Sequence, residues 1–188
     1  MSGGYYFLVA SLPHLKFGAA PRLTPAQFLT RCAGQVSAAH YRILAGVELV
    51  QTQPAKTGLA LLDRWYERER ALRNALVIER AKRLGVTAAG HLRDFRPDPR
   101  LAEIARQLLA LDSPLTADEE LDRARWRFLE ELAFGHYFDL ETLVVYLLKL
   151  RILERRARFD LLVGAALLDR MLAHGAERGR EAFARSGN

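Results

Sequence analysis

Apolar side chains recur every three or four positions along most of this chain, the spacing of helices that bury one face. The pattern is most regular from Leu59 to Leu84, and Gly85 then follows as a residue that favours helix termination. The stretch QTQPAKTG on the N-terminal side has the composition of a loop around Pro54. The pattern therefore predicts one long helix that follows a loop.

Two signals predict helices before that loop. Thr24 to Gln27, read as TPAQ, is a capping box with proline at the first helical position. A helix should run from there towards Cys32. The apolar spacing predicts a second helix from about Gln35 to Glu48.

Similar signals predict two helices in the second half of the chain. Asp98 followed by Pro99 repeats the combination of a cap and a proline, and starts the segment RLAEIARQLLAL. Thr116 to Glu119, read as TADE, is another capping box, and Gly135 should end the helix that it opens. The apolar positions of that helix are Leu121, Trp126, Phe128, Leu129 and Leu132.

A further helix is expected from Leu140 to about Arg155, with Asp139 as its cap. Its apolar residues fall on nearly every side, which favours a central core helix. The alternative, that one flank of it docks a partner, stays open. The helical pattern could continue, with a break, to Gly175.

The opening run YYFLVASLPHL, from Tyr5 to Leu15, is the one stretch that the pattern allows as a strand, and it has no evident partner strand. The preceding MSGG lacks the basic start of a signal peptide, so the run should belong to the mature fold. We expect an all-α, single-domain helical bundle with long central helices over residues 1–175. The polar tail, 176–188, should fray.

Composition agrees with a globular domain, because 50% of the residues are hydrophobic and 27% are charged. Cys32 is the single cysteine, which excludes an internal disulfide and fits a reducing compartment. We expect it to be a small apolar filler on a helix. The longest apolar stretch is interrupted by Lys149 and Arg151, well short of the about 20 residues that span a bilayer. These features predict a soluble, cytoplasmic protein without a transmembrane segment.

The net charge is +6 and the sequence pI is about 9.8. Acidic residues are interleaved with the arginines, as in DRWYERERALRNALVIERAKR, which is typical of a solvated helix face with ion pairs. A concentrated basic tract of the kind that phosphate binding favours is absent from the sequence. Nucleic acid is therefore not the expected partner.

A search of the sequence for catalytic motifs gives no support for an enzyme. The glycine-containing stretches lack the spacing and the Lys-Ser/Thr ending of a phosphate-binding loop. No Glu has a His three residues later, as a di-iron bundle requires, and adjacent Glu130 and Glu131 point about 100° apart. The histidines lack the spacing that places two imidazoles on one metal: His14, His40, His91, His136 and His174. We expect no catalytic residues, no cofactor and no metal site.

Two of the expected helices contain similar segments. NALVIERAK, from Asn74 to Lys82, can be laid over ETLVVYLLK, from Glu141 to Lys149. Both have an aliphatic centre followed by Lys. Since amphipathic helices mimic one another easily, a pseudo-repeat of helical units stays open.

Three segments together resemble a known family: YYFLVASLPHL, LRNALVIERAKRLG and FDLETLVVYLLKLRILERR. They resemble an uncharacterised family of small helical proteins encoded beside bacterial V-type ATPase genes. That family is similar to a shortened form of the ATPase's C subunit, the counterpart of the eukaryotic d subunit. The full-length C subunit is all-helical, is built from pseudo-repeats, and joins the central stalk to the membrane ring. The resemblance gives Arg80, Lys82, Lys149 and Arg151 places comparable to its Arg-x-Lys pattern.

The resemblance implies a non-catalytic component or assembly factor of a bacterial V-type ATPase that translocates protons or sodium ions. Its partners would be V-type ATPase subunits of the central stalk or membrane ring, with peripheral association at the inner face of the cell membrane. The net positive charge would suit anionic lipid head groups or an acidic stalk surface.

We expect the partner-binding surface to be a basic strip from the two similar helices, formed by Arg73, Arg80, Lys82, Arg83, Lys149, Arg151 and Arg155. These side chains could equally be solvated charges, or could pack their stems within the bundle. The alternative function is a free-standing helical regulator that binds nucleic acid through its arginine-rich helices.

Overall fold

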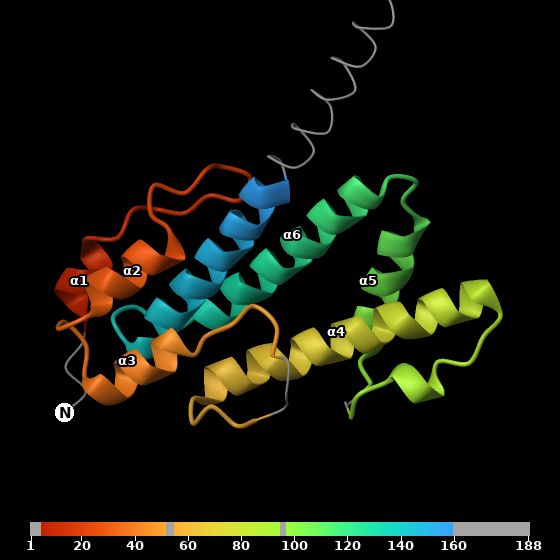
Figure 1. Cartoon of the computed structure of the whole chain (residues 1–188), viewed down its shortest axis with the longest axis horizontal. Helices are drawn as coiled ribbons and strands as arrows, with labels where there is room; N and C mark the ends of the chain where they lie inside the picture. The colour runs from red at the N-terminus through yellow and green to blue at the C-terminus, as the bar shows by residue number, and fades with distance from the viewer. Residues whose placement is uncertain (1–4, 52–54, 95–96, 160–188) are drawn as a thin grey trace, which may run out of the picture.

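The computed structural model describes residues 5–51, 55–94 and 97–159, and these ranges contain helices and no strand (Figure 1). The expected all-α fold is confirmed. The elements in order are α1 (Tyr6–Ala10), α2 (Pro25–Cys32), α3 (Ala38–Ala45), α4 (Ala60–Leu84), the 3₁₀ helix η1 (Ala89–His91), α5 (Pro99–Ala110) and α6 (Pro114–Ala133). A last helix covers 140–159 and has no label in Figure 1. The predicted continuation to Gly175 and the tail lie outside the described residues.

The predicted termini of several helices are confirmed by their hydrogen bonds. At α2, Thr24 Oγ1 accepts from the Gln27 amide at 3.2 Å and Gln27 Oε1 accepts from the Thr24 amide at 3.0 Å, so both halves of the capping box are present. At α5, the Asp98 carboxylate accepts from the Arg100 amide at 2.8 Å, and Gly85 ends α4 with a φ of 65°. These local signals therefore fix where the chain enters and leaves its helices.

The capping box predicted at Thr116 is wrong. Helix α6 begins at Pro114, and the Ser113 hydroxyl is the cap that accepts from the Thr116 amide at 3.4 Å. Ser113 followed by Pro114 is the same combination of cap and proline that starts α5. Thr116 is consequently the third residue of the helix.

The strand that the pattern allowed at the opening run does not form, because residues 6–10 form helix α1. A lone strand would leave its backbone groups without partners, whereas a helical turn pairs them internally. The Ser11 amide, for example, donates to the Phe7 carbonyl at 3.1 Å. Leu8 is buried in the core, and the Tyr5 amide donates to the carbonyl of Phe138 at 2.6 Å. The run thus belongs to the folded domain.

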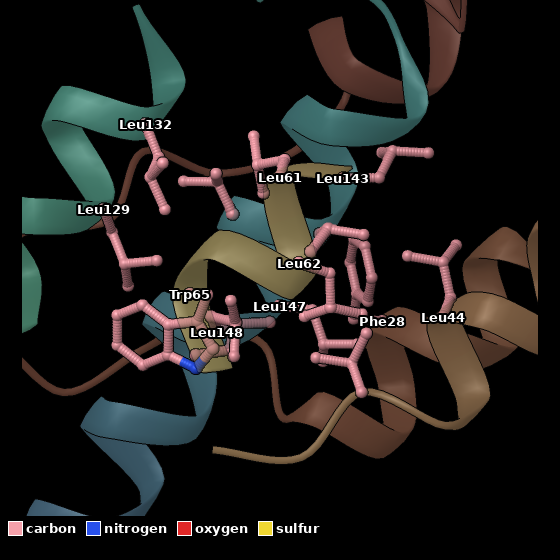
Figure 2. Close-up of a cluster of buried hydrophobic side chains, with 14 of the residues drawn as sticks. Phe28, Leu44, Leu61, Leu62, Trp65, Leu129, Leu132, Leu143, Leu147 and Leu148 are labelled. Carbon is pink, nitrogen blue, oxygen red and sulfur yellow. The ribbon is translucent and has the colours of Figure 1, made fainter. Parts of the chain in front are cut away.

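The main hydrophobic core surrounds the helix over 140–159. Leu143, Leu147, Leu148 and Leu150 are fully buried there, which confirms the expected central core helix. Figure 2 shows its leucines among side chains from α2, α3, α4 and α6. The side chains that it labels from those helices are Phe28, Leu44, Leu61, Leu62, Trp65, Leu129 and Leu132.

Helix α4 connects this core to a second, smaller one. Its N-terminal part contributes Trp65 and Tyr66 to the main core, and its middle contributes Leu72 to a cluster with Leu101 and Ala105 of α5. In Figure 1, α4 extends away from α1, α2 and α3 towards α5. The C-terminal end of α4 therefore lies far from the central helix.

Candidate functional site

The basic residues predicted on α4 are exposed. Arg73, Arg80, Lys82 and Arg83 all lie on the outer surface of the helix. The Lys82 ammonium lies 2.7 Å from a Glu79 carboxylate oxygen, and the Arg83 guanidinium donates to the backbone carbonyl of Leu109 in α5. Arg73 and Arg80 have no ion pair with any residue of the described ranges, so they are available to a partner.

The basic residues predicted on the last helix have different surroundings, because each contacts an acidic side chain of the fold. Lys149 lies 3.8 Å from Glu130 and 4.7 Å from the centre of the Trp126 ring. Burial lowers the pKa of Lys149, and Glu130 partly offsets that effect. Arg151 lies 3.5 Å from Glu48.

The predicted residues of the two helices therefore differ in their exposure and in their partners. The Lys82 side chain is 65% exposed, whereas that of Lys149, its counterpart in the similar segments, is 17% exposed. Arg83 contacts α5, whereas Arg73 lies beside Gln51 and Tyr66. The last helix is packed against α6 and the N-terminal helices (Figure 1). A role of these residues in partner binding, together or as separate groups, stays a prediction.

A buried ion network that the sequence analysis missed joins three helices. The Arg125 guanidinium of α6 donates to both carboxylate oxygens of Glu69 in α4, through Nε at 3.0 Å and through Nη2, and to Asp122 at 3.1 Å. Arg155 of the last helix reaches Asp122 and Asp118 at 2.8 Å. Glu69 is 3% exposed and Asp122 is fully buried.

The charges of this network compensate for its burial. Desolvation lowers the pKa of Arg125, but the carboxylates of Glu69 and Asp122 outweigh it, so the net pKa lies above the ordinary value. A buried charge is strongly destabilising when its partner is removed. The network therefore fixes α4, α6 and the last helix relative to one another.

Several large aromatic side chains are exposed and form an aromatic surface. We define it as Tyr6, Phe7, Phe134, Tyr137 and Phe138, from α1 and from the connection between α6 and the last helix. Phe7 is 86% exposed and Phe134 is 87% exposed. The Tyr6 ring centre lies 4.8 Å from that of Phe138 and 5.5 Å from that of Phe7. Large aromatic side chains gathered on one surface are typical of interaction sites.

The connection beside these aromatics also contains a compact polar cluster. Ligand atoms of His136, Asp139 and Glu141 all lie within 4.8 Å of one another. Asp139 already accepts from the Thr142 amide at 2.9 Å, as the predicted helix cap, and lies 2.6 Å from the His136 ring. Burial raises the pKa of Asp139, but the His136 and Thr142 hydrogen bonds outweigh it and lower the pKa overall.

The cluster is explained by helix capping. The N-terminal end of a helix carries partial positive charge, which favours an anionic cap and opposes a bound cation.

Cys32 is fully buried on α2, as the sequence predicted. Burial raises its pKa to about 11, so it is an apolar filler and not a reactive thiolate at neutral pH.

Comparison with known proteins adds one similarity. Residues 93–174 match a family described as a protein of unknown function, DUF2764. No curated protein and no solved structure matches the chain. The matched range covers less than half of the chain and includes α5, α6 and the last helix. It also includes Phe134, Tyr137 and Phe138 of the aromatic surface.

None of the helices in the described ranges combines the length and the hydropathy that a bilayer-spanning segment requires.

Proposed function

We propose that this chain is a non-catalytic helical component or assembly factor of a bacterial V-type ATPase, a proton- or sodium-translocating complex. It acts by protein–protein contacts at the junction of the central stalk and the membrane ring. The resemblance of three segments to small proteins encoded with that ATPase supports the identity of the partner. The function does not require an active site.

The observation that carries a protein-binding role is the aromatic surface. Phe7 and Phe134 are almost completely exposed to water, so neither side chain contributes hydrophobic stabilisation to the isolated fold. At an interface, buried aromatic side chains often cost about 2 kcal/mol or more when truncated. The surface joins two segments far apart in the sequence, α1 and residues 134–138, so it exists only in the folded protein.

The alternative, nucleic-acid binding, is less well supported by the placement of charge. Lys149, Arg151 and Arg155 are engaged with carboxylates of the same chain, so they are poorly available for phosphate contacts. The basic residues left on the surface of α4 are accompanied by acidic ones. Duplex DNA would therefore bind weakly and without a steep salt dependence.

The experiment compares recovery of partners by wild-type and variant protein from native membranes. The tagged chain is produced in the bacterium that naturally carries it, and co-purifying proteins are identified by mass spectrometry. We expect V-type ATPase subunits with the wild type. Phe7→Ser combined with Phe134→Ser should lose them while keeping the helical circular-dichroism spectrum, because both side chains are exposed.

A matched control changes apolar exposure at the other end of the molecule. Leu84→Ser combined with Val86→Ser replaces side chains that are 74% and 59% exposed near the end of α4, on the opposite side from α1 (Figure 1). This control should recover the ATPase subunits like the wild type. Equal recovery by both double variants would contradict the role of the aromatic surface. Failure of the wild type to recover any part of the ATPase would contradict the proposed function.

A further inference from the structure

A cavity of about 190 Å³ lies against the middle of α4. Its walls come from α4, from the segment after α3, from η1 and from the segment that follows η1. The residues that matter for its chemistry are Tyr66, Arg70, Arg73, Asn74, His91 and Arg93. The aromatic surface lies elsewhere on the molecule, so the cavity is a separate site.

The wall formed by the segment after α3 is held in place by Trp65 and Tyr66 of α4. The Trp65 indole donates to the Leu49 carbonyl at 3.1 Å, and the Tyr66 hydroxyl accepts from the Glu48 amide at 3.0 Å. These bonds fix the segment after α3. A buried side-chain donor or acceptor is costly to leave without a partner, so the bonds also explain why polar groups are tolerated at these positions.

The opposite wall is fixed by one buried amide. Asn74 donates from Nδ2 to the Arg93 carbonyl at 2.7 Å and accepts from the Arg93 amide at 3.2 Å. The Arg93 guanidinium also donates to the Gln51 carbonyl at 3.5 Å, which links the two walls. The cavity is therefore formed before any ligand arrives, and preorganisation of this kind lowers the cost of binding.

The charge around the cavity is strongly positive. Arg70 and Arg73 contribute guanidinium groups, while the acidic lining residue, Glu69, is already paired with Arg125 in the buried ion network. Within the described ranges, Arg70 and Arg73 have no ion pair. Two like charges three residues apart on a helix repel each other. An anion in the cavity would relieve that repulsion.

The hydrogen-bonding groups match the same ligand. Guanidinium groups donate in a planar fork that suits phosphate oxygens and often binds them through two bonds. The Tyr66 hydroxyl, which accepts from Glu48, donates its own proton to none of the described residues and is therefore available as one more donor.

We propose that this cavity binds a phosphate group, either free or as the monoester head of a lipid. One water needs roughly 10–15 Å³ of such space, so the cavity holds more than a single solvent molecule. Sites for larger organic ligands are typically about 300–1,000 Å³, so the cavity fits an ion or a small head group better than a nucleotide. The proposal is independent of the ATPase role.

The test titrates the full chain with inorganic phosphate by isothermal calorimetry at pH 7 and constant ionic strength, with chloride as the reference anion. We expect saturable binding of one phosphate per chain. Arg73→Gln and Arg70→Gln should each weaken binding about tenfold or more, because each removes charge-assisted hydrogen bonds worth about 1.5–3 kcal/mol. Circular dichroism should show both variants folded, since neither side chain pairs within the described fold.

Arg80→Gln is the matched control. Arg80 is two helical turns beyond Arg73 on the same face of α4, is exposed, and does not line the cavity. The Arg80→Gln variant should bind phosphate like the wild type. Loss of binding by Arg80→Gln as large as that by Arg73→Gln would overturn the proposal, because it would mean diffuse charge attraction.

A second arm identifies the source of the phosphate. Flotation with vesicles of phosphatidylcholine plus phosphatidic acid is compared with flotation with phosphatidylcholine alone. Binding to the phosphatidic acid vesicles that Arg73→Gln weakens, without binding of free phosphate, would support a lipid head group as the ligand. Absence of both inorganic phosphate binding and Arg73-dependent vesicle binding would refute the site.

Discussion

Replacing Arg125 by Met should destabilise the protein more than replacement of any exposed arginine. Methionine keeps an unbranched, flexible stem but removes the guanidinium that donates to Glu69 and Asp122. Asp122 retains Arg155, whereas Glu69 retains no hydrogen bond from another described side chain. Glu69 would then be an uncompensated charge that is 3% exposed.

The magnitude follows from this burial. Breaking a buried ion pair by removing one partner costs about 3–5 kcal/mol. For a chain of this size, each kcal/mol shifts the melting temperature by roughly 2–4 °C, so we expect a fall of ~6–20 °C. The control is Arg127→Met on the same helix, because Arg127 is 64% exposed and lies 3.8 Å from Glu120. An exposed pair of this kind contributes about 0–1 kcal/mol.

Urea unfolding at pH 7, followed by far-ultraviolet circular dichroism, measures both variants. A third variant, Glu69→Leu combined with Arg125→Met, removes the stranded carboxylate together with its partner. It should be more stable than Arg125→Met alone, because replacing both members of a buried pair by apolar residues is often neutral or stabilising. A loss below about 1 kcal/mol for Arg125→Met, or additive effects in the double variant, would refute this reasoning.

Two further predictions concern the cap of α6 and the buried thiol. Ser113→Ala should lower the free energy of unfolding by about 1 kcal/mol, whereas Thr116→Ala should change it by less than about 0.5 kcal/mol; the reverse order in urea unfolding would contradict the observed cap. Cys32 should react with Ellman's reagent at pH 8 only as fast as the protein unfolds, because its pKa of about 11 and its burial keep the thiol protonated and covered. Rapid reaction of the native protein would contradict that assignment.

The sequence predicts much of the helical fold because the signals involved are local. The capping box at Thr24, the cap and proline at Asp98 and the glycine at position 85 depend on neighbouring residues alone. The opening run stayed ambiguous between strand and helix because five apolar residues fit either structure. Its contact with Phe138, far along the chain, determines its place and cannot be read from its own composition.

The interaction features were harder to predict because they depend on which helices meet. Lys149 and Arg155 of the predicted basic strip lie beside carboxylates of α6, which their own segment of the sequence does not reveal. Arg125 and Asp122 share the buried face of α6 with Phe128, Leu129 and Leu132, and charges among these apolar positions were a signal for a buried pair. The partner of Arg125, Glu69, 56 residues away, only becomes evident in the folded protein.

The sequence contains a partial signal for the aromatic surface. Phe134, Tyr137 and Phe138 flank the expected helix end at Gly135, where the pattern predicts an exposed turn. Aromatic residues at such a turn are available to a partner unless another segment covers them. Whether α1 would bury these aromatics or add its own to them depends on tertiary packing. In the structure, Tyr6 of α1 packs against Phe138 and both side chains stay exposed.

The most direct test of the proposed role is whether the purified chain binds a purified V-type ATPase from the same bacterium. Sedimentation velocity of the fluorescently labelled chain, mixed with increasing amounts of the detergent-solubilised complex, measures this without other cell components. We predict that the wild-type chain moves with the complex in a saturable way and that the Phe7→Ser/Phe134→Ser variant does not. A wild-type chain that sediments alone at every concentration of the complex would contradict the account.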